Sequence, residues 1–211
     1  IPKGHTVRTI DDLGDLRGQR VLARLIGFVL LFIITIESVN AVEVFLVRDT
    51  LGATAAQFGA TEAAAGIGVV IGALGSSAVS GTRARIRAVV LLLSAVAAAQ
   101  LTQGLAPSVG IYLGLTVVVG TLMGAINTIL MTLLVTATDL RTRGAVVALV
   151  GGAARASSTA ALAVGGILGT VATPRLAFVV VGTTGMVIGI AASTLVRTAQ
   201  TGESPELKKR N

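Results

Sequence analysis

Six apolar blocks fill most of this 211-residue chain, and each is long enough to cross a lipid bilayer. They cover Val21–Val47, Ala55–Ser80, Ile86–Gly104, Ser108–Thr138, Ala145–Ala172 and Leu176–Arg197. The chain is 53% hydrophobic and 13% charged, whereas soluble domains carry about 25% charged residues. We therefore predict an all-α, polytopic membrane protein whose six-helix transmembrane bundle covers residues 21–197. Residues 1–20 then form a cytoplasmic linker and residues 198–211 a cytoplasmic tail.

The linker places Leu13, Leu16 and Leu22 among charged residues. This pattern predicts an amphipathic helix lying near the membrane surface. A solvated linker without that helix is the other interpretation. The chain begins at Ile1 without a recognisable signal peptide, which indicates a piece of something longer.

Lysine and arginine are distributed unequally between the two sides of the predicted bundle. Fourteen of the 17 lie in the linker, the second and fourth loops and the tail or, for Arg24, Arg87 and Arg197, at the adjoining ends of the blocks. The opposite loops hold only Arg48 and Arg175, and Arg155 lies inside the fifth block. Because cytoplasmic loops carry the excess of positive charge, both termini are predicted to be cytoplasmic, in the cell (inner or plasma) membrane. The net charge of +7 is spread over short loops and forms no continuous stripe, so we expect no nucleic-acid partner.

Glycines four residues apart recur along the blocks and lie on one face of a helix in each case. The pairs are Gly68/Gly72, Gly110/Gly114, Gly120/Gly124, Gly165/Gly169 and Gly185/Gly189. Such faces let two backbones approach closely in a membrane, so they predict tight helix packing.

The first block carries Glu37, Asn40 and Glu43 within an apolar run. A charge at the centre of the bilayer costs ~2.5–3.5 kcal/mol on insertion scales. We therefore expect this polar face to point at another helix or at a water-filled cavity. Glu37 falls near the midplane, whereas Glu43 lies close enough to the outer interface for contact with water to be the alternative.

Three other blocks carry strongly polar residues: Glu62 in the second, near its outer end, Asn127 in the fourth, and Arg155 in the fifth. The third and sixth blocks have no charge in their middles. This distribution predicts a repeat of three plus three helices, in which Asn40 and Asn127 occupy corresponding helices.

Several site chemistries find no support in the residues. The chain has no cysteine and one histidine, His5, which lies outside the blocks. No Ser–His pair can therefore form in the membrane, and neither an HExxH motif nor a phosphate-binding GxxxxGK[ST] loop occurs. We predict no enzyme activity, no cofactor and no metal site.

Three stretches resemble the C-terminal half of a major facilitator superfamily transporter, most closely the bacterial drug and metabolite exporters. They are LRGQRVLARL, VEVFLVRDTLGATAAQFG and LRTRGAVVALVGGAARASSTAALAVGGILGTV. The resemblance implies that the first and fourth spans line a substrate cavity, the second and fifth shape its gates, and the third and sixth face lipid. It also implies a missing partner, which is either an N-terminal six-helix half or a second copy.

On this basis we expect a secondary transporter that exports small amphiphilic molecules by alternating access, driven by protons. Its substrate and proton pathway would comprise Glu37, Asn40, Glu43, Asn127 and Arg155. The loop residues Asp139, Arg141 and Arg143 are candidates for a cytoplasmic gate, or else simply set the topology. An ion pair between Glu37 and Arg155 that only holds the bundle together remains open. So do an oligomeric six-span channel and a non-transporting membrane scaffold.

Overall fold

The computed structural model describes residues 10–201, with side chains described over residues 23–194. The described chain contains six helical spans long and apolar enough to cross a membrane, which confirms the predicted all-α, six-span architecture. The elements are α1 (Ile10–Glu37), α2 (Asn40–Val44), the π-helix η1 (Phe45–Thr50), α3 (Ala55–Gly75), the 3₁₀-helix η2 (Ser76–Ala78), α4 (Thr82–Gly104), α5 (Val109–Ala137), α6 (Arg143–Val171) and α7 (Pro174–Thr201).

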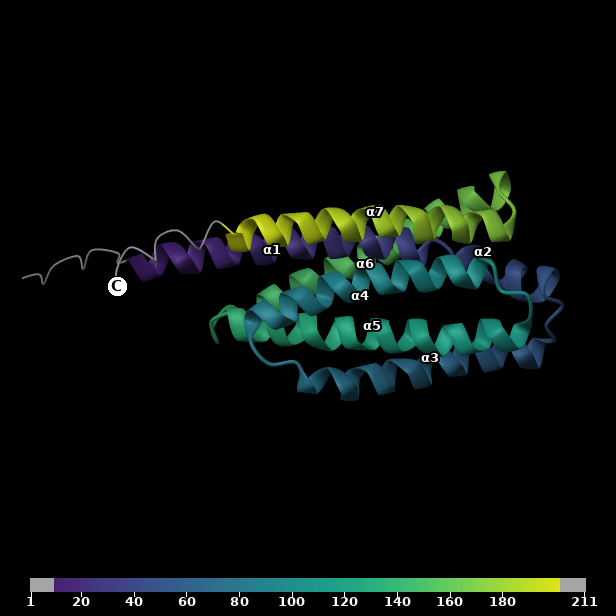
Figure 1. Ribbon diagram of the computed structural model, residues 1–211, viewed down its shortest axis with the longest axis horizontal. Helices are drawn as coiled ribbons and strands as arrows, with labels where there is room; N and C mark the ends of the chain where they lie inside the picture. The colour runs from purple at the N-terminus through teal and green to yellow at the C-terminus, as the bar shows by residue number, and fades with distance from the viewer. Residues whose placement is uncertain (1–9, 202–211) are drawn as a thin grey trace, which may run out of the picture.

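The helices lie side by side, with the start of α1 and the end of α7 at the same end of the bundle (Figure 1). We call this the terminal end and the opposite one the distal end. Helix α1 starts at Ile10 and continues into the first span without interruption, so residues 10–20 of the predicted linker are helical. Residues 1–9 of the linker and 202–211 of the predicted tail lie outside the described residues.

Helix packing follows the predicted repeat of three plus three. Helix α3 packs on α5 as α6 packs on α1, and α4 packs on α5 as α7 packs on α1. Helices α4 and α7 pack on each other. Exchanging the first three spans with the last three therefore reproduces the main helix–helix contacts. Since α1 starts at the terminal end and α5 at the distal end, the two triplets run in opposite directions (Figure 1).

Glycine pairs make the two equivalent close contacts of this repeat. A Cβ added at Gly72 of α3 would overlap the Thr121 carbonyl of α5, and one at Gly120 of α5 would overlap the Ala65 carbonyl of α3. In the other half, a Cβ at Gly165 of α6 would overlap the Ser38 carbonyl of the first span. The backbones approach directly at these positions because the glycine has no side chain to hold the neighbouring carbonyl away.

The other predicted glycine pairs differ in use. Gly185 and Gly189 of α7 lie against Ala97 and Ser94 of α4, so this pair also packs helices. Gly110 and Gly114 have open space around them, and they therefore face outward from the described bundle.

The first span is not one continuous α-helix, although a single helix was predicted over residues 21–47. Helix α1 ends at Glu37, a turn follows at Ser38 and Val39, and the π-helix η1 closes the span. The Ser38 hydroxyl donates to the Thr35 carbonyl at 2.6 Å, and Gly165 of α6 lies against the Ser38 carbonyl. Serine back-bonding and the close approach of a second backbone both disturb the regular hydrogen-bond ladder.

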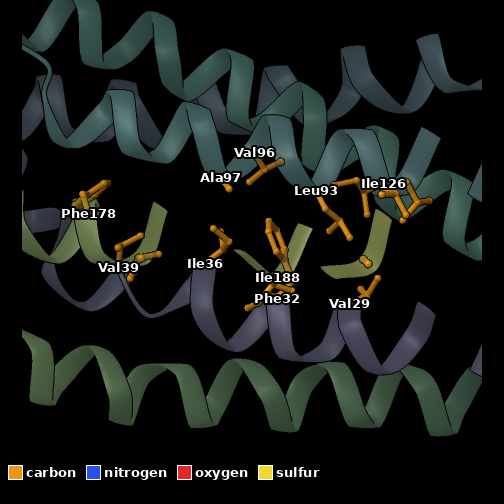
Figure 2. Close-up of a cluster of buried hydrophobic side chains, with 14 of the residues drawn as sticks. Val29, Phe32, Ile36, Val39, Leu93, Val96, Ala97, Ile126, Phe178 and Ile188 are labelled. Atoms are coloured by element: carbon orange, nitrogen blue, oxygen red, sulfur yellow. The ribbon is translucent and has the colours of Figure 1, made fainter. Parts of the chain in front are cut away.

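The apolar core lies between α1, α4, α5 and α7. Phe32 and Ile36 of α1 lie beside Ala97 of α4 and Ile188 of α7 (Figure 2). Four spans thus bury their inner faces together, while α6 is the least buried span and touches the bundle mainly through α1 and α2.

Arg175 fixes one helix end at the distal side. Its two terminal nitrogens donate to the carbonyls of Gly104 and Ala106, each at 3.1 Å, and so satisfy the exposed carbonyls where α4 ends. One of the two distal arginines is therefore a helix cap.

The glycine contact predicts a position-specific effect of Gly72→Ala. The added methyl group has to displace α5, so we expect a loss of stability of about 1–3 kcal/mol, measured as a lower midpoint of thermal unfolding in detergent. Gly66→Ala in the same helix is the matched control, because Gly66 is exposed with open space around it. Equal melting temperatures for the two variants would contradict the packing described here.

Candidate functional site

The two triplets leave a cavity of about 290 Å³ between α1, α5 and α6. It runs from Ile26, toward the terminal end, to Glu37, where α1 ends. Three of the predicted pathway residues line it: Glu37 from α1, Asn127 from α5 and Arg155 from α6. Residues that are far apart in the sequence are brought together because α6 packs on the first span and also contacts α5.

Apolar side chains make up most of the cavity wall. They come from all three helices and include Val29, Ile33, Leu130, Met131 and Val150. The polar groups are few: Glu37 on α1, Asn127 on α5, and Arg155 and Ser158 on α6. A mostly apolar wall with a small number of polar groups is typical of small-molecule sites. The fifth span lines the cavity together with the first and fourth, whereas the resemblance had placed it at the gates. The reason is the glycine contact at Gly165, which holds α6 against the first span.

Glu37 and Arg155 carry opposite charges in this cavity and are the only charged residues among its lining. Within the described side chains, no ion pair joins them. Glu37 is half-buried, and Arg155 and Asn127 are exposed on the open side of the cavity. Both charges are therefore open to solvent or to a bound molecule.

Asn40 and Glu43 do not line this cavity. Asn40 is exposed in the distal half of the first span. Glu43 lies further along and accepts a hydrogen bond of 2.8 Å from the Tyr112 hydroxyl of α5. The polar face predicted from the sequence is thus split between a cavity at Glu37 and a helix contact at Glu43.

Tyr112 was not among the residues predicted from the sequence to form the site. Its side chain is almost fully buried, and its ring stands edge-on to Phe178 of α7 with centroids 6.2 Å apart. One turn further, Thr116 accepts a hydrogen bond of 3.0 Å from Gln103 of α4. These contacts join four spans at the distal end. A lone tyrosine in a chain with 3% aromatic residues was the only available signal.

The candidate cytoplasmic gate has no ion pair among the described residues. Arg143 donates instead to the Thr138 carbonyl at 3.4 Å, near the end of α5. The backbone amides of Thr142 and Arg143 donate to the Asp139 carbonyl and form the turn into α6. Arg141 is exposed. In this conformation, the three residues shape the α5–α6 connection.

The described residues form six spans of alternating direction, and the two triplets of spans are inverted relative to each other. A cavity with polar and apolar lining lies between α1, α5 and α6. A family model described as Major Facilitator Superfamily matches residues 22–211. The chain belongs to the major facilitator superfamily. Neither the comparison with curated proteins nor that with solved structures found a match.

Membership makes this chain a multi-pass membrane protein and a membrane transporter of the superfamily. The match covers all six spans, so all six belong to the transporter bundle.

The Tyr112–Glu43 hydrogen bond predicts coupling between these two positions. We expect Tyr112→Phe and Glu43→Ala each to lower the free energy of unfolding, and the double variant to lose about 1 kcal/mol less than the sum of the two single losses. Unfolding by denaturing detergent, followed by circular dichroism, gives the three values. Strictly additive losses would show that the bond contributes nothing.

Proposed function

We propose that this chain is part of a proton-coupled secondary transporter that exports small amphiphilic molecules by alternating access. The supporting observation is the cavity in which Glu37, Asn127 and Arg155 meet amid apolar walls. The apolar walls suit a hydrophobic body, and the polar groups Glu37, Asn127 and Arg155 suit a polar head. A carboxylate in such a cavity can exchange a proton with whichever side of the membrane the cavity faces.

Alternating access requires a second body against which the bundle moves, and we propose a second six-helix bundle. It would be an N-terminal half or another copy of this chain. Support comes from the side of the bundle where Asn127 and Arg155 are exposed, since polar side chains at this depth are costly against lipid.

The unequal distribution of arginine supports a membrane orientation with both termini cytoplasmic. Arg83, Arg85 and Arg87 begin α4 at the terminal end, and Arg141 and Arg143 precede and begin α6 there. The terminal end of the bundle then faces the cytoplasm, and the bundle lies in the cell membrane.

Glu37→Gln tests the proton step. In everted vesicles with an acidic interior, we expect the natural protein to move protons out of the vesicles, and so to dissipate the proton gradient, when an amphiphilic substrate is added. We expect the proton flux of Glu37→Gln to be at least about tenfold lower than that of the natural protein, because the amide cannot carry the proton. The flux is read from the fluorescence of a pH-sensitive dye.

The matched control is Glu62→Gln, since Glu62 is exposed on α3 and does not line the cavity. It should leave the flux unchanged. Full proton flux in Glu37→Gln would remove this carboxylate from the mechanism. A flux that rises linearly with substrate, without saturation, would favour a channel.

A further inference from the structure

The cavity wall contains one negative and one positive side chain, and they come from two helices, α1 and α6, that pack on each other. Glu37 ends α1, and Arg155 lies near the middle of α6. Their charges sum to zero, yet no ion pair joins them within the described side chains. The Asn127 amide from α5 adds one acceptor and two donor protons, and Ser158, whose hydroxyl donates to the Ala154 carbonyl, is the remaining polar side chain in the lining.

A ligand that fills the cavity displaces the water around both charged groups. A ligand with only a positive group would pair with Glu37 and leave Arg155 desolvated and unpaired. A ligand with only a negative group would pair with Arg155 and leave Glu37 desolvated and unpaired. An unpaired charge removed from water is costly, so each singly charged ligand is penalised by the group it cannot satisfy.

A ligand that carries both charges satisfies both groups. An arginine guanidinium presents a fork of N–H donors that matches a carboxylate or phosphate. A glutamate carboxylate accepts from an ammonium group. The Asn127 amide on α5 also lines the cavity and can orient the polar part, while Val29, Ile33 and Leu130 offer an apolar surface.

We propose that the substrate of this transporter is a small zwitterion with an apolar body, whose oxyanion binds Arg155 and whose ammonium group binds Glu37. The inference rests on the proposed transport function and specifies its substrate class. A cavity of about 290 Å³ lies at the small end of ligand sites, so the zwitterion is a small molecule.

Two series of compounds test this, each built on one apolar scaffold. The short series comprises 2-amino-4-phenylbutanoate, the amine without its carboxylate, and 4-phenylbutanoate. The long series comprises 4-(4-aminobutyl)benzoate, 4-phenylbutylamine and 4-butylbenzoate. Phosphonate analogues of both zwitterions distinguish a carboxylate site from a phosphate site. Binding to the full protein in nanodiscs is measured by calorimetry, independently of flux.

On at least one scaffold, we expect the zwitterion to bind about tenfold more tightly than either singly charged compound. Arg155→Gln should remove this advantage over the amine, and Glu37→Gln should remove the advantage over the acid. Arg155→Lys keeps the positive charge and should keep most of the preference. Arg48→Gln is the matched control, because Arg48 is exposed at the distal end and outside the cavity.

Equal affinity for the amine and the zwitterion, or binding of none of the compounds, would overturn this inference. A zwitterion preference that survives in both Arg155→Gln and Glu37→Gln would overturn it as well. Selective binding of the zwitterion without any transport would instead contradict the proposed function, and transport of singly charged amphiphiles alone would contradict only the substrate class.

Discussion

Direct backbone contact at glycine is the constraint on which the rest of this bundle depends. Lipid is as apolar as leucine, so transmembrane helices gain little from burying leucine and associate through close packing. Gly72 and Gly120 hold α3 against α5, and Gly165 holds α6 against the first span. The two contacts are equivalent under exchange of the triplets. The contact at Gly165 brings α6 beside the first span at the cavity. Within the described side chains, no ion pair joins the two charges there.

The polar residues of the first span divide according to depth. Glu37, near its middle, lies at the cavity, whereas Glu43, near the distal end, is hydrogen-bonded by Tyr112. The turn at Ser38 and Val39 separates them. One part of the span is therefore fixed to α5, and the other offers its carboxylate to a ligand.

Much of the fold was predictable from the sequence because bilayer thickness and loop charge leave few alternatives. The six spans and their boundaries follow from apolar run length, and the packing role of four of the five glycine pairs follows from their spacing. The meeting of Glu37 and Arg155 in one cavity depends on which helices are neighbours, a property that hydropathy does not encode. Hydrogen bonds such as Tyr112–Glu43 and Gln103–Thr116 join common polar side chains on different helices, so no local sequence pattern predicts them.

The interrupted first span was equally invisible, because its residues read as one apolar run. The cause lies partly in another helix: Gly165 of α6 reaches the Ser38 carbonyl. Local pattern predicts a helix there, and tertiary contact modifies it.

The central claim is that the side of the bundle formed by α1, α5 and α6 borders water. The chain contains no cysteine, so single cysteines report on one position at a time. Ala154→Cys lies in the cavity wall, and Leu91→Cys, on the exposed side of α4, is its apolar counterpart. In membranes, a charged thiosulfonate reagent should modify the cysteine at position 154 rapidly and the one at position 91 hardly at all. Equal and negligible modification at both positions would place this side of the bundle in lipid and contradict the transporter site proposed for it.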